Sequence, residues 1–306
     1  MIKEFIRRWC PNWLHQWYAA TKYYLRFKFH PQGLASEMFR GILGYEMNWD
    51  NPRDINEKIN WMKFNYDTSE WSRLADKYLV REYVKERIGE NVLPFIYGCW
   101  EKAEDINFDK LPEKFVFKTN QGCGTVMPVK NKASLNKVET ISTLNKWAMM
   151  KFGYKTVEPH YLKIKPVIYA EEYLEDDTNF SNSLVDYKVF CLSGKPYCIL
   201  VCTNRILGSH PDLSFYDCNW NYMSDILPNG YLEGNSNIPK PECLDLLLDY
   251  SRKLSKGHPQ VRIDFYIVKG RIYFGEMTFT SQGGYMDYIS REYSLKMGEL
   301  VNLPTI

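Results

Sequence analysis

The sequence predicts an α+β protein in which antiparallel hairpins supply the sheets and a helical region comes first. Three pairs of apolar segments are each joined by a short glycine-containing turn, which is the pattern of β-hairpins. Segments with apolar residues at helical spacing lie before and between these hairpins. The 306 residues are 45% hydrophobic and 25% charged, which suits one large enzyme or a few subdomains around a cleft.

Composition argues against several functional classes. The net charge is only +2, so the chain as a whole lacks the basic character of a nucleic-acid-binding protein. Eight cysteines without a paired CxxC spacing and five unclustered histidines argue against a zinc site and indicate a reducing compartment. No stretch approaches about 18 continuous apolar residues, and the first residues lack the apolar core of a signal peptide. We therefore expect a cytoplasmic protein. Its N-terminus leaves open a location at the inner face of the membrane.

Residues 1–40 combine many basic and aromatic residues with only two acidic ones. Pro11 can begin a helix but breaks one that is already running, so a helical turn, a kink and a second helix are expected. The segment either lies on an anionic membrane surface, as basic amphipathic segments do, or packs its aromatic residues on the enzyme body. The second alternative is the commoner outcome, because charge runs usually mark a solvated face.

Two helices and a short strand are predicted between residues 50 and 100. The segment NPRDIN supplies an N-cap candidate, Asp54 or Asn56, for the first helix. The run DKYLVREYVKERIGE has apolar residues at helical spacing, and Gly89 ends this second helix. The segment VLPFIYGCW then has the composition of a short strand.

The first hairpin carries a lysine beside a glycine-rich tip. FVFKTN and TVMPVK are the predicted strands, Gly122 and Gly124 lie between them, and a helix follows across residues 134–152. Glycines at such a tip let backbone N–H groups approach phosphate oxygens, and Lys118 supplies a positive charge nearby. Taken alone this is weak evidence, because the tip is not a Walker loop and strand lysines are common.

A strand over VIYAEEYL precedes the second hairpin, which is formed by DYKVFCL and YCILVCTNR. The segment PECLDLLLDYSRKLSKG then predicts a helix with a proline near its start and Gly257 at its end.

The last hairpin, VRIDFYI-VKG-RIYFGEMTF, places two carboxylates on paired strands. Asp264 lies in an otherwise apolar strand, where an unpaired carboxylate would be costly, and Glu276 returns on the partner strand. Close carboxylates repel unless a cation holds them, so Mg²⁺ is one explanation and an ordinary pair of surface acids is the other. A two-residue turn would pair Asp264 with Gly275, so a bulge or a longer loop is needed to bring both acids to one face.

The order of these parts resembles the ATP-grasp superfamily, and most closely its TupA-like (teichuronopeptide-biosynthesis-like) branch of bacterial polysaccharide clusters. Six segments in the family's order carry the resemblance: NPRDINEKINWMKF, ADKYLVREYVKERIGE, LPEKFVFKTNQGCG, IYAEEYL, DYKVFCLSGKPYCI and VRIDFYIVKGRIYFGEMTF. The resemblance implies an ATP-grasp architecture in three parts. These are an N-terminal helical and pre-grasp region at 1–110, a small ATP-grasp subdomain at 111–170, and a C-terminal subdomain with the metal-binding sheet at 171–306.

The resemblance also implies roles in nucleotide binding. Lys77 and Lys118 would contact the ATP phosphates beside the glycine tip, although a solvated helix lysine is the alternative for Lys77. Asp186 would be the ribose-binding acid, with Glu175, Asp176 and Asp177 as competitors for that role. Backbone groups of four consecutive residues would bond the adenine edge, namely Glu171, Glu172, Tyr173 and Leu174.

A catalytic and metal-binding set is implied for the C-terminal subdomain. Lys188 would meet the phosphates or the transferred group, and Arg205 and Arg262 would stabilise an acyl-phosphate. Asp264 and Glu276 would hold Mg²⁺, usually two ions in this superfamily.

The sequence departs from many ATP-grasp enzymes at Thr278, where they have asparagine two residues beyond the last metal-binding glutamate. A hydroxyl is a poorer metal ligand than an amide oxygen, so we expect the second Mg²⁺ to be bound more weakly or through water. The loop that follows resembles a substrate-facing loop with backbone donors for a carboxylate or phosphate, and a plain flexible loop is the alternative. The residues concerned are Thr280, Ser281, Gly283 and Gly284.

We therefore expect an ATP- and Mg²⁺-dependent ligase that activates a carboxylate as an acyl-phosphate and joins it to an amine. The resemblance implies that the carboxylate is a uronic acid of a bacterial surface polysaccharide or its precursor. Two alternatives stay open. One is a kinase that phosphorylates a glycan hydroxyl in the same site, and the other is a glycosyltransferase or a non-catalytic component of polysaccharide synthesis.

Overall fold

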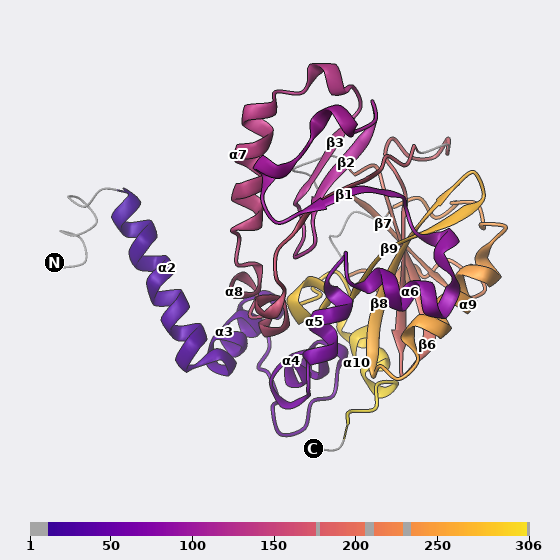
Figure 1. The fold of residues 1–306 in the computed structure, drawn as a ribbon. Coiled ribbons are helices and arrows are strands. Elements are labelled where there is room, and N and C mark those ends of the chain that lie inside the picture. The colour runs from indigo at the N-terminus through magenta and orange to yellow at the C-terminus, as the bar shows by residue number, and fades with distance from the viewer. Residues whose placement is uncertain (1–11, 176–177, 206–210, 229–233, 305–306) are drawn as a thin grey trace.

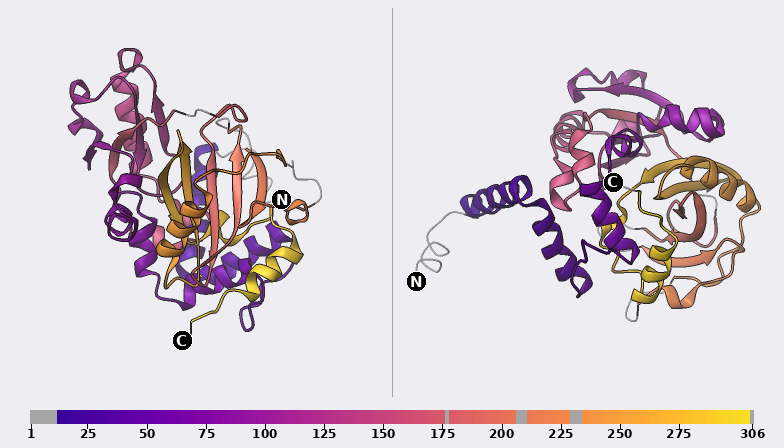
Figure 2. Two further views of the ribbon diagram at one scale, coloured as in Figure 1. Left: turned by 90° about the vertical axis from the view of Figure 1, so that its right-hand side faces the viewer. Right: turned by 90° about the horizontal axis from the view of Figure 1, so that it is seen from below.

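The computed structural model describes residues 12–175, 178–205, 211–228 and 234–304, with the backbone alone for residues 12–20 (Figure 1). Two antiparallel sheets form the body, one of four strands and one of five. Helices gather beneath both sheets in Figure 1, and Figure 2 shows the same arrangement from two other sides. They are α4 (Ile55–Asn65), α5 (Ser69–Ala75) and α10 (Arg291–Glu299). The predicted α+β class is confirmed.

The four-stranded sheet contains the predicted glycine-tipped hairpin. Its order is β1-β4-β2-β3, with β1 (Ile96–Trp100), β4 (Ile168–Glu172), β2 (Phe115–Thr119) and β3 (Val126–Val129). Phe115 and Phe117 of β2 share a buried cluster with Leu144 of helix α7 (Lys137–Ala148), because alternate strand residues face the same side. Strand β1 precedes residue 110 and β4 runs past residue 170, so this sheet crosses both predicted subdomain boundaries.

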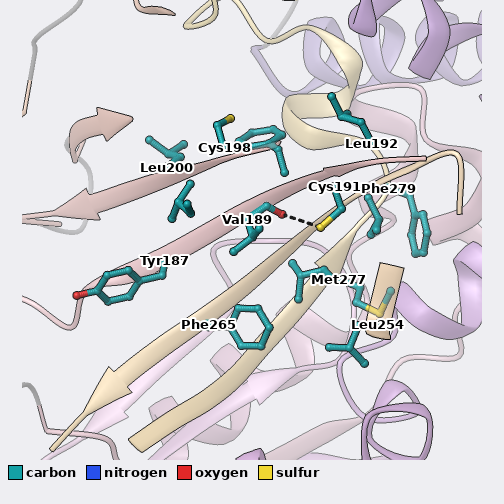
Figure 3. Close-up of a cluster of buried hydrophobic side chains, with 14 of the residues drawn as sticks. Tyr187, Val189, Cys191, Leu192, Cys198, Leu200, Leu254, Phe265, Met277 and Phe279 are labelled. Atoms are coloured by element: carbon teal, nitrogen blue, oxygen red, sulfur yellow. Dashed lines mark hydrogen bonds between the residues drawn. The ribbon is translucent and has the colours of Figure 1, made fainter. Parts of the chain in front are cut away.

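The five-stranded sheet carries the other two predicted hairpins. Its order is β7-β6-β5-β8-β9, with β7 (Asp212–Asp217), β6 (Lys195–Thr203), β5 (Asp186–Leu192), β8 (Gln260–Val268) and β9 (Arg271–Thr278). Val189 and Cys191 of β5 lie in the buried cluster of Figure 3, together with Leu254 of helix α9 (Leu244–Ser255). Residues that alternate with them along β5, among them Asp186 and Lys188, therefore point to the opposite face.

Helix α4 is anchored to α10 at its N-terminus. Asp54 is the N-cap, as one of the two predicted candidates, and it forms a capping box with Glu57. The buried Asp54 carboxylate also pairs with Arg291 of α10. Gly298 permits this close approach, since a Cβ there would collide with the carbonyl oxygen of Arg53. The predicted helix that Gly89 ends is likewise present, as α6 (Val80–Ile88).

Helices α2 (Asn12–Phe29) and α3 (Pro31–Leu43) form an N-terminal arm, and α2 extends away from the sheets (Figures 1 and 2). The C-terminal part of α2 packs on the body, where the Tyr23 hydroxyl donates to the carbonyl oxygen of Lys155 at 3.0 Å. The ring of Phe27 lies 4.9 Å from that of Tyr154 in α8 (Phe152–Lys155). Pro11, where a kink was predicted, lies outside the described residues. Among the described helices, none is both long and apolar enough to cross a bilayer.

A β-bulge in the last hairpin brings the two predicted acids to one face. Phe265 pairs with Phe274, whereas Asp264 pairs with Glu276, so Gly275 is the extra residue. A Cβ on Gly275 would lie 2.9 Å from the carbonyl oxygen of Asp264, which is closer than real side chains come. The predicted need for a bulge is therefore confirmed, and glycine is the residue that fits it.

The buried His160 predicts a specific pH dependence of stability. Its side chain is fully buried, and both of its ring nitrogens lack a hydrogen-bond partner among the described residues. Burial lowers the pKa of His160 to about 3, whereas the pKa of an unfolded histidine is about 6.5. Unfolding therefore takes up a proton below about pH 6.5, and stability falls as the pH falls.

We expect His160→Leu to lose about 2 kcal/mol less of its free energy of unfolding between pH 7 and pH 5 than the wild type loses. Urea unfolding of both proteins at the two pH values measures this difference. Equal losses in the two proteins would contradict it.

Candidate active site

Arg262 and Asp264 of β8 form the centre of the site. The Arg262 guanidinium donates from Nε to Oδ1 of Asp264 at 2.7 Å and from Nη2 to Oδ2 at 2.8 Å. The same Nη2 lies 3.2 Å from Oε1 of Glu276 on β9, and Lys188 of β5 also pairs with Asp264. Only 2% of the Asp264 side chain is exposed, and a buried carboxylate is stable only with such partners.

Lys77 joins this centre to the glycine-rich tip. Its Nζ lies 3.3 Å from Oε2 of Glu276 and also donates to the carbonyl oxygen of Gly122. Burial alone would raise the pKa of Glu276, but Lys77 and Arg262 outweigh burial and hold this pKa well below its usual range. Glu276 is therefore ionised at neutral pH and faces cations from two distant parts of the chain.

Asn120 and Asp76 hold Lys77 in this position, and neither residue was predicted. The Asn120 side-chain amide donates to Oδ2 of Asp76 at 2.7 Å and to the carbonyl oxygen of Lys165 at 2.9 Å. Its Oδ1 accepts from the backbone N–H of Val167 at 2.8 Å. The backbone N–H of Lys77 donates to the Asn120 carbonyl oxygen at 3.0 Å. The one sequence signal is an asparagine between a strand and a glycine-rich turn, which is common in loops.

Asp186, the predicted ribose-binding acid, is buried between two of the predicted cations. An Nη atom of Arg205 lies 2.7 Å from its Oδ2, and Nζ of Lys188 lies 3.2 Å from its Oδ1. Burial would lower the pKa of Lys188, but Asp186 and Asp264 outweigh burial and raise it. The structure thus links Lys188 and Arg205 to the acid pair through one continuous set of charges.

Lys118 pairs with Glu171 across strands β2 and β4. Tyr169 lies opposite Lys118 in the sheet. Burial raises the pKa of the Tyr169 hydroxyl, and the nearby charges of Glu171 and Glu276 raise it further.

The predicted adenine-binding segment divides into two parts. Glu171 lies between β1 and β2, and the backbone N–H of Glu172 donates to the carbonyl oxygen of Phe95 at 2.8 Å. Glu171 and the backbone N–H of Glu172 are thus already paired within the sheet. Tyr173 and Leu174 follow the end of β4, so their backbone remains the candidate for the adenine edge.

Thr278 and Ser281 adjoin the acid pair. The Thr278 hydroxyl lies 3.2 Å from Oε1 of Glu276 and 3.2 Å from Nη2 of Arg262. The Ser281 hydroxyl lies 3.5 Å from Nη1 of Arg262. The predicted metal-binding and substrate-facing residues thus meet at the Arg262 guanidinium.

The polar groups of the other predicted loop residues are hydrogen-bonded to side chains inside the protein. The buried Thr280 hydroxyl donates to Glu158, so it is not directed at a substrate. The carbonyl oxygens of Gly283 and Gly284 accept from side chains of helix α4. The backbone N–H of Gly283 donates within the loop, to the carbonyl oxygen of Thr280 at 2.8 Å. These contacts argue against a plain flexible loop.

Asp264 and Glu276 form a donor set that suits Mg²⁺ bound together with a nucleotide. Within the described ranges, no three His, Cys, Asp or Glu side chains are placed to hold a metal ion. Mg²⁺ usually takes one or two carboxylates and completes its shell with water and substrate phosphates. Two carboxylates on paired strands, with a hydroxyl beside them, meet that requirement.

Comparison with solved structures finds several ligases and a biotin carboxylase complex. D-alanine–D-alanine ligase from Bacillus anthracis matches at 17% identity over 81% of this chain and 66% of that chain, with a TM-score of 0.44. An L-amino acid ligase from Bacillus licheniformis matches at 12% identity over 72% and 43%, with a TM-score of 0.42. A biotin carboxylase–ATP complex from Campylobacter jejuni matches at 16% identity over 78% and 48%, with a TM-score of 0.42. The chain therefore spans less than two thirds of the length of these proteins.

No curated protein sequence matches the chain. A family model, however, covers most of it: the model described as TupA-like ATPgrasp matches residues 57–302, which include both sheets and every residue of the charged cluster. This chain belongs to the TupA-like ATP-grasp family.

Proposed function

We propose that the protein is an ATP- and Mg²⁺-dependent ligase that forms an amide from a carboxylate and an amine. The observation that carries the proposal is the Arg262–Asp264–Glu276 cluster, which Lys77 joins to the glycine-rich tip. Phosphoryl transfer needs cations at the phosphates, backbone donors near them and carboxylates for Mg²⁺. All three kinds of group gather around this cluster.

The tip hairpin would bind the ATP phosphates. Lys118 and Lys77 supply the positive charge, and Gly122 and Gly124 have φ values of 68° and 77°, which favour glycine. A Cβ on Gly122 would also collide with the ring of Phe152, so the tip has no room for a side chain there. The backbone of residues 173–174 would bond the adenine edge, and Asp186 would bond the ribose.

Asp264 and Glu276 would hold Mg²⁺, which neutralises phosphate charge when it is bound with the nucleotide. The substrate carboxylate attacks the γ-phosphorus of ATP in line, and ADP leaves as the acyl-phosphate forms. Arg262, Lys188 and Arg205 stabilise the negative charge of that group. The amine then displaces phosphate and forms the amide. No side-chain nucleophile is required, because positioning and charge neutralisation supply most of the rate.

The carboxylate we propose is a uronic acid of a bacterial surface polysaccharide or of its precursor, and the amine is an amino acid or another small amine. Family membership and the position of Ser281 beside Arg262 support this choice. Helix α2 has no acidic residue and exposes Leu25 and Phe29 together with Lys28. A basic helix with exposed apolar side chains suits an anionic membrane surface, where lipid-linked glycans are found.

The reaction is tested by ADP release from Mg²⁺-ATP with a panel of uronic acids and amines. We expect release to require both a uronic acid and an amine, and we expect a hydroxamate when hydroxylamine replaces the amine. A phosphorylated product that resists hydroxylamine would identify a kinase instead. Calorimetry that finds no ATP binding, with or without Mg²⁺, would contradict both activities.

Replacing the Arg262 guanidinium should separate chemistry from nucleotide binding. We expect Arg262→Ala to reduce amide formation by roughly 10²–10³-fold while ATP affinity stays largely intact, because the guanidinium acts on the acyl-phosphate. Arg271→Ala is the matched control, since Arg271 lies in the same hairpin but donates to the carbonyl oxygen of Asn91 at 3.0 Å. Normal turnover by Arg262→Ala would show that its assigned role is wrong.

A further inference from the structure

Residues 280–284 have a backbone conformation that needs support. Gln282, Gly283 and Gly284 have φ values of 47°, 68° and 81°, so three consecutive residues lie in the left-handed region. The loop packs against residues 156–158, where the β-branched Val157 has a φ of 55°. Such conformations are costly for residues other than glycine and persist only where surrounding contacts hold them. The chemistry proposed above does not use the groups that supply those contacts.

Lys63 of helix α4 supplies the first set of contacts. Its side chain is 4% exposed, and its ammonium donates to the carbonyl oxygen of Gly283, to Oδ1 of Asn60 at 2.9 Å and to the carbonyl oxygen of Thr156 at 3.4 Å. The ring of Tyr285 lies beneath it, with 4.6 Å from Nζ to the ring centre. An ammonium group has three donors, and each has an acceptor here. Lys63 therefore directs its side chain at acceptors inside the protein. Burial lowers the pKa of Lys63 to about 7, and the nearby Glu158 carboxylate opposes this.

Glu158 supplies the second set. Its side chain is 3% exposed and accepts from the hydroxyls of Thr280 and Thr156. Burial raises the pKa of Glu158, and the nearby Lys63 charge opposes this. Thr156 connects the two charged residues, since its carbonyl oxygen meets Lys63 and its hydroxyl meets Glu158. Two buried side chains, Glu158 and Lys63, thus hold the two ends of the same short loop.

The loop also reaches the catalytic centre. The Ser281 hydroxyl, between the two anchored ends, lies 3.5 Å from Nη1 of Arg262. The Asn60 side chain donates to the carbonyl oxygen of Gly284 at 2.7 Å and so fixes the far end. A Cβ on Gly283 would lie 2.8 Å from Cβ of Thr156, so the loop and the 156–158 segment are in tight contact. Movement of the buried pair would therefore move the residues next to Arg262.

We infer that Lys63 and Glu158 are positioning residues that set the loop 280–284 against Arg262 and thereby fix where the substrate carboxylate binds. The inference rests on the proposed function for the identity of the ligand. The placement of the loop by the buried pair is a separate physical claim that does not depend on the reaction.

The test compares Lys63→Met with Lys58→Met in the full-length protein. Lys58 is a matched control, because it lies on the same helix and also donates to backbone carbonyl oxygens, those of Gly298 and Val301, both at 2.8 Å. Hydrogen exchange is followed at the amides of Gly283 and Tyr285, which donate within the loop at 2.8 and 3.2 Å. We expect Lys63→Met to accelerate exchange at these two amides, and Lys58→Met to leave them unchanged.

Two kinetic quantities are measured, kcat/KM for the carboxylate substrate and the affinity for ATP. Lys63→Met should lower kcat/KM for the carboxylate roughly 10- to 100-fold, since small misplacements of a positioning group have effects of that size. ATP affinity should stay at its wild-type value. Glu158→Gln keeps the shape of the side chain, so it should change loop exchange and kcat/KM less, in the same direction. It replaces Lys63→Met in the test if that variant does not fold.

The outcomes separate the two claims. Unchanged loop exchange and unchanged kcat/KM in both variants would overturn the positioning role, as would equal effects of Lys63→Met and Lys58→Met. Faster loop exchange in Lys63→Met, with no amide product from the wild type on any substrate, would retain the positioning role and reject the proposed function.

Discussion

A carboxylate buried in an apolar strand is stable only if cations and hydrogen bonds take the place of water around it. Asp264 meets this requirement through Arg262 and Lys188, and the bulge at Gly275 sets Glu276 opposite it. Under the proposed function, the cations that neutralise these acids in the protein alone would also contact the phosphate groups of ATP. A metal ion and a triphosphate can therefore exchange ionic partners with the site without leaving any charge buried and unpaired. That exchange is what a site for Mg²⁺ and ATP requires.

The two sheets contribute different parts of the site, and Asn120 positions Lys77, which pairs with Glu276 of the five-stranded sheet. Asn120 satisfies its side-chain amide with Asp76 and with the backbone ahead of β4, and it holds the Lys77 backbone in the same contact. Lys77 can then reach both the glycine tip and Glu276. Buried polar groups with every partner in place make such geometry rigid, because each lost contact leaves an unsatisfied group in a medium of low dielectric constant. The position of the Lys77 side chain therefore depends on the hydrogen bonds that Asn120 makes.

Sequence analysis predicted the features whose causes are local. The hairpins, the Asp54 cap and the bulge follow from alternation, capping chemistry and the parity of side chains along paired strands. The family likeness then supplied Lys77, Lys188 and Arg205, which the structure brings into one cluster with the acids. Asn120, Lys63 and Glu158 were missed because their contacts with Asp76, Gly283 and Thr280 span 44 to 220 residues of the chain, so no local pattern marks them. Glu172 and Thr280 were predicted to face ligands, yet the backbone N–H of Glu172 is bonded within the sheet and the hydroxyl of Thr280 is bonded to a buried carboxylate.

The central claim is that the last hairpin and the glycine-tipped hairpin bind one Mg²⁺-nucleotide between them. A crystal structure with Mg²⁺ and a non-hydrolysable ATP analogue tests it most directly. The account predicts a metal ion at about 2.0–2.1 Å from oxygens of Asp264 and Glu276, with the phosphates in contact with Lys118 and Lys77. A nucleotide bound elsewhere, or a metal ion that touches neither carboxylate, would contradict it.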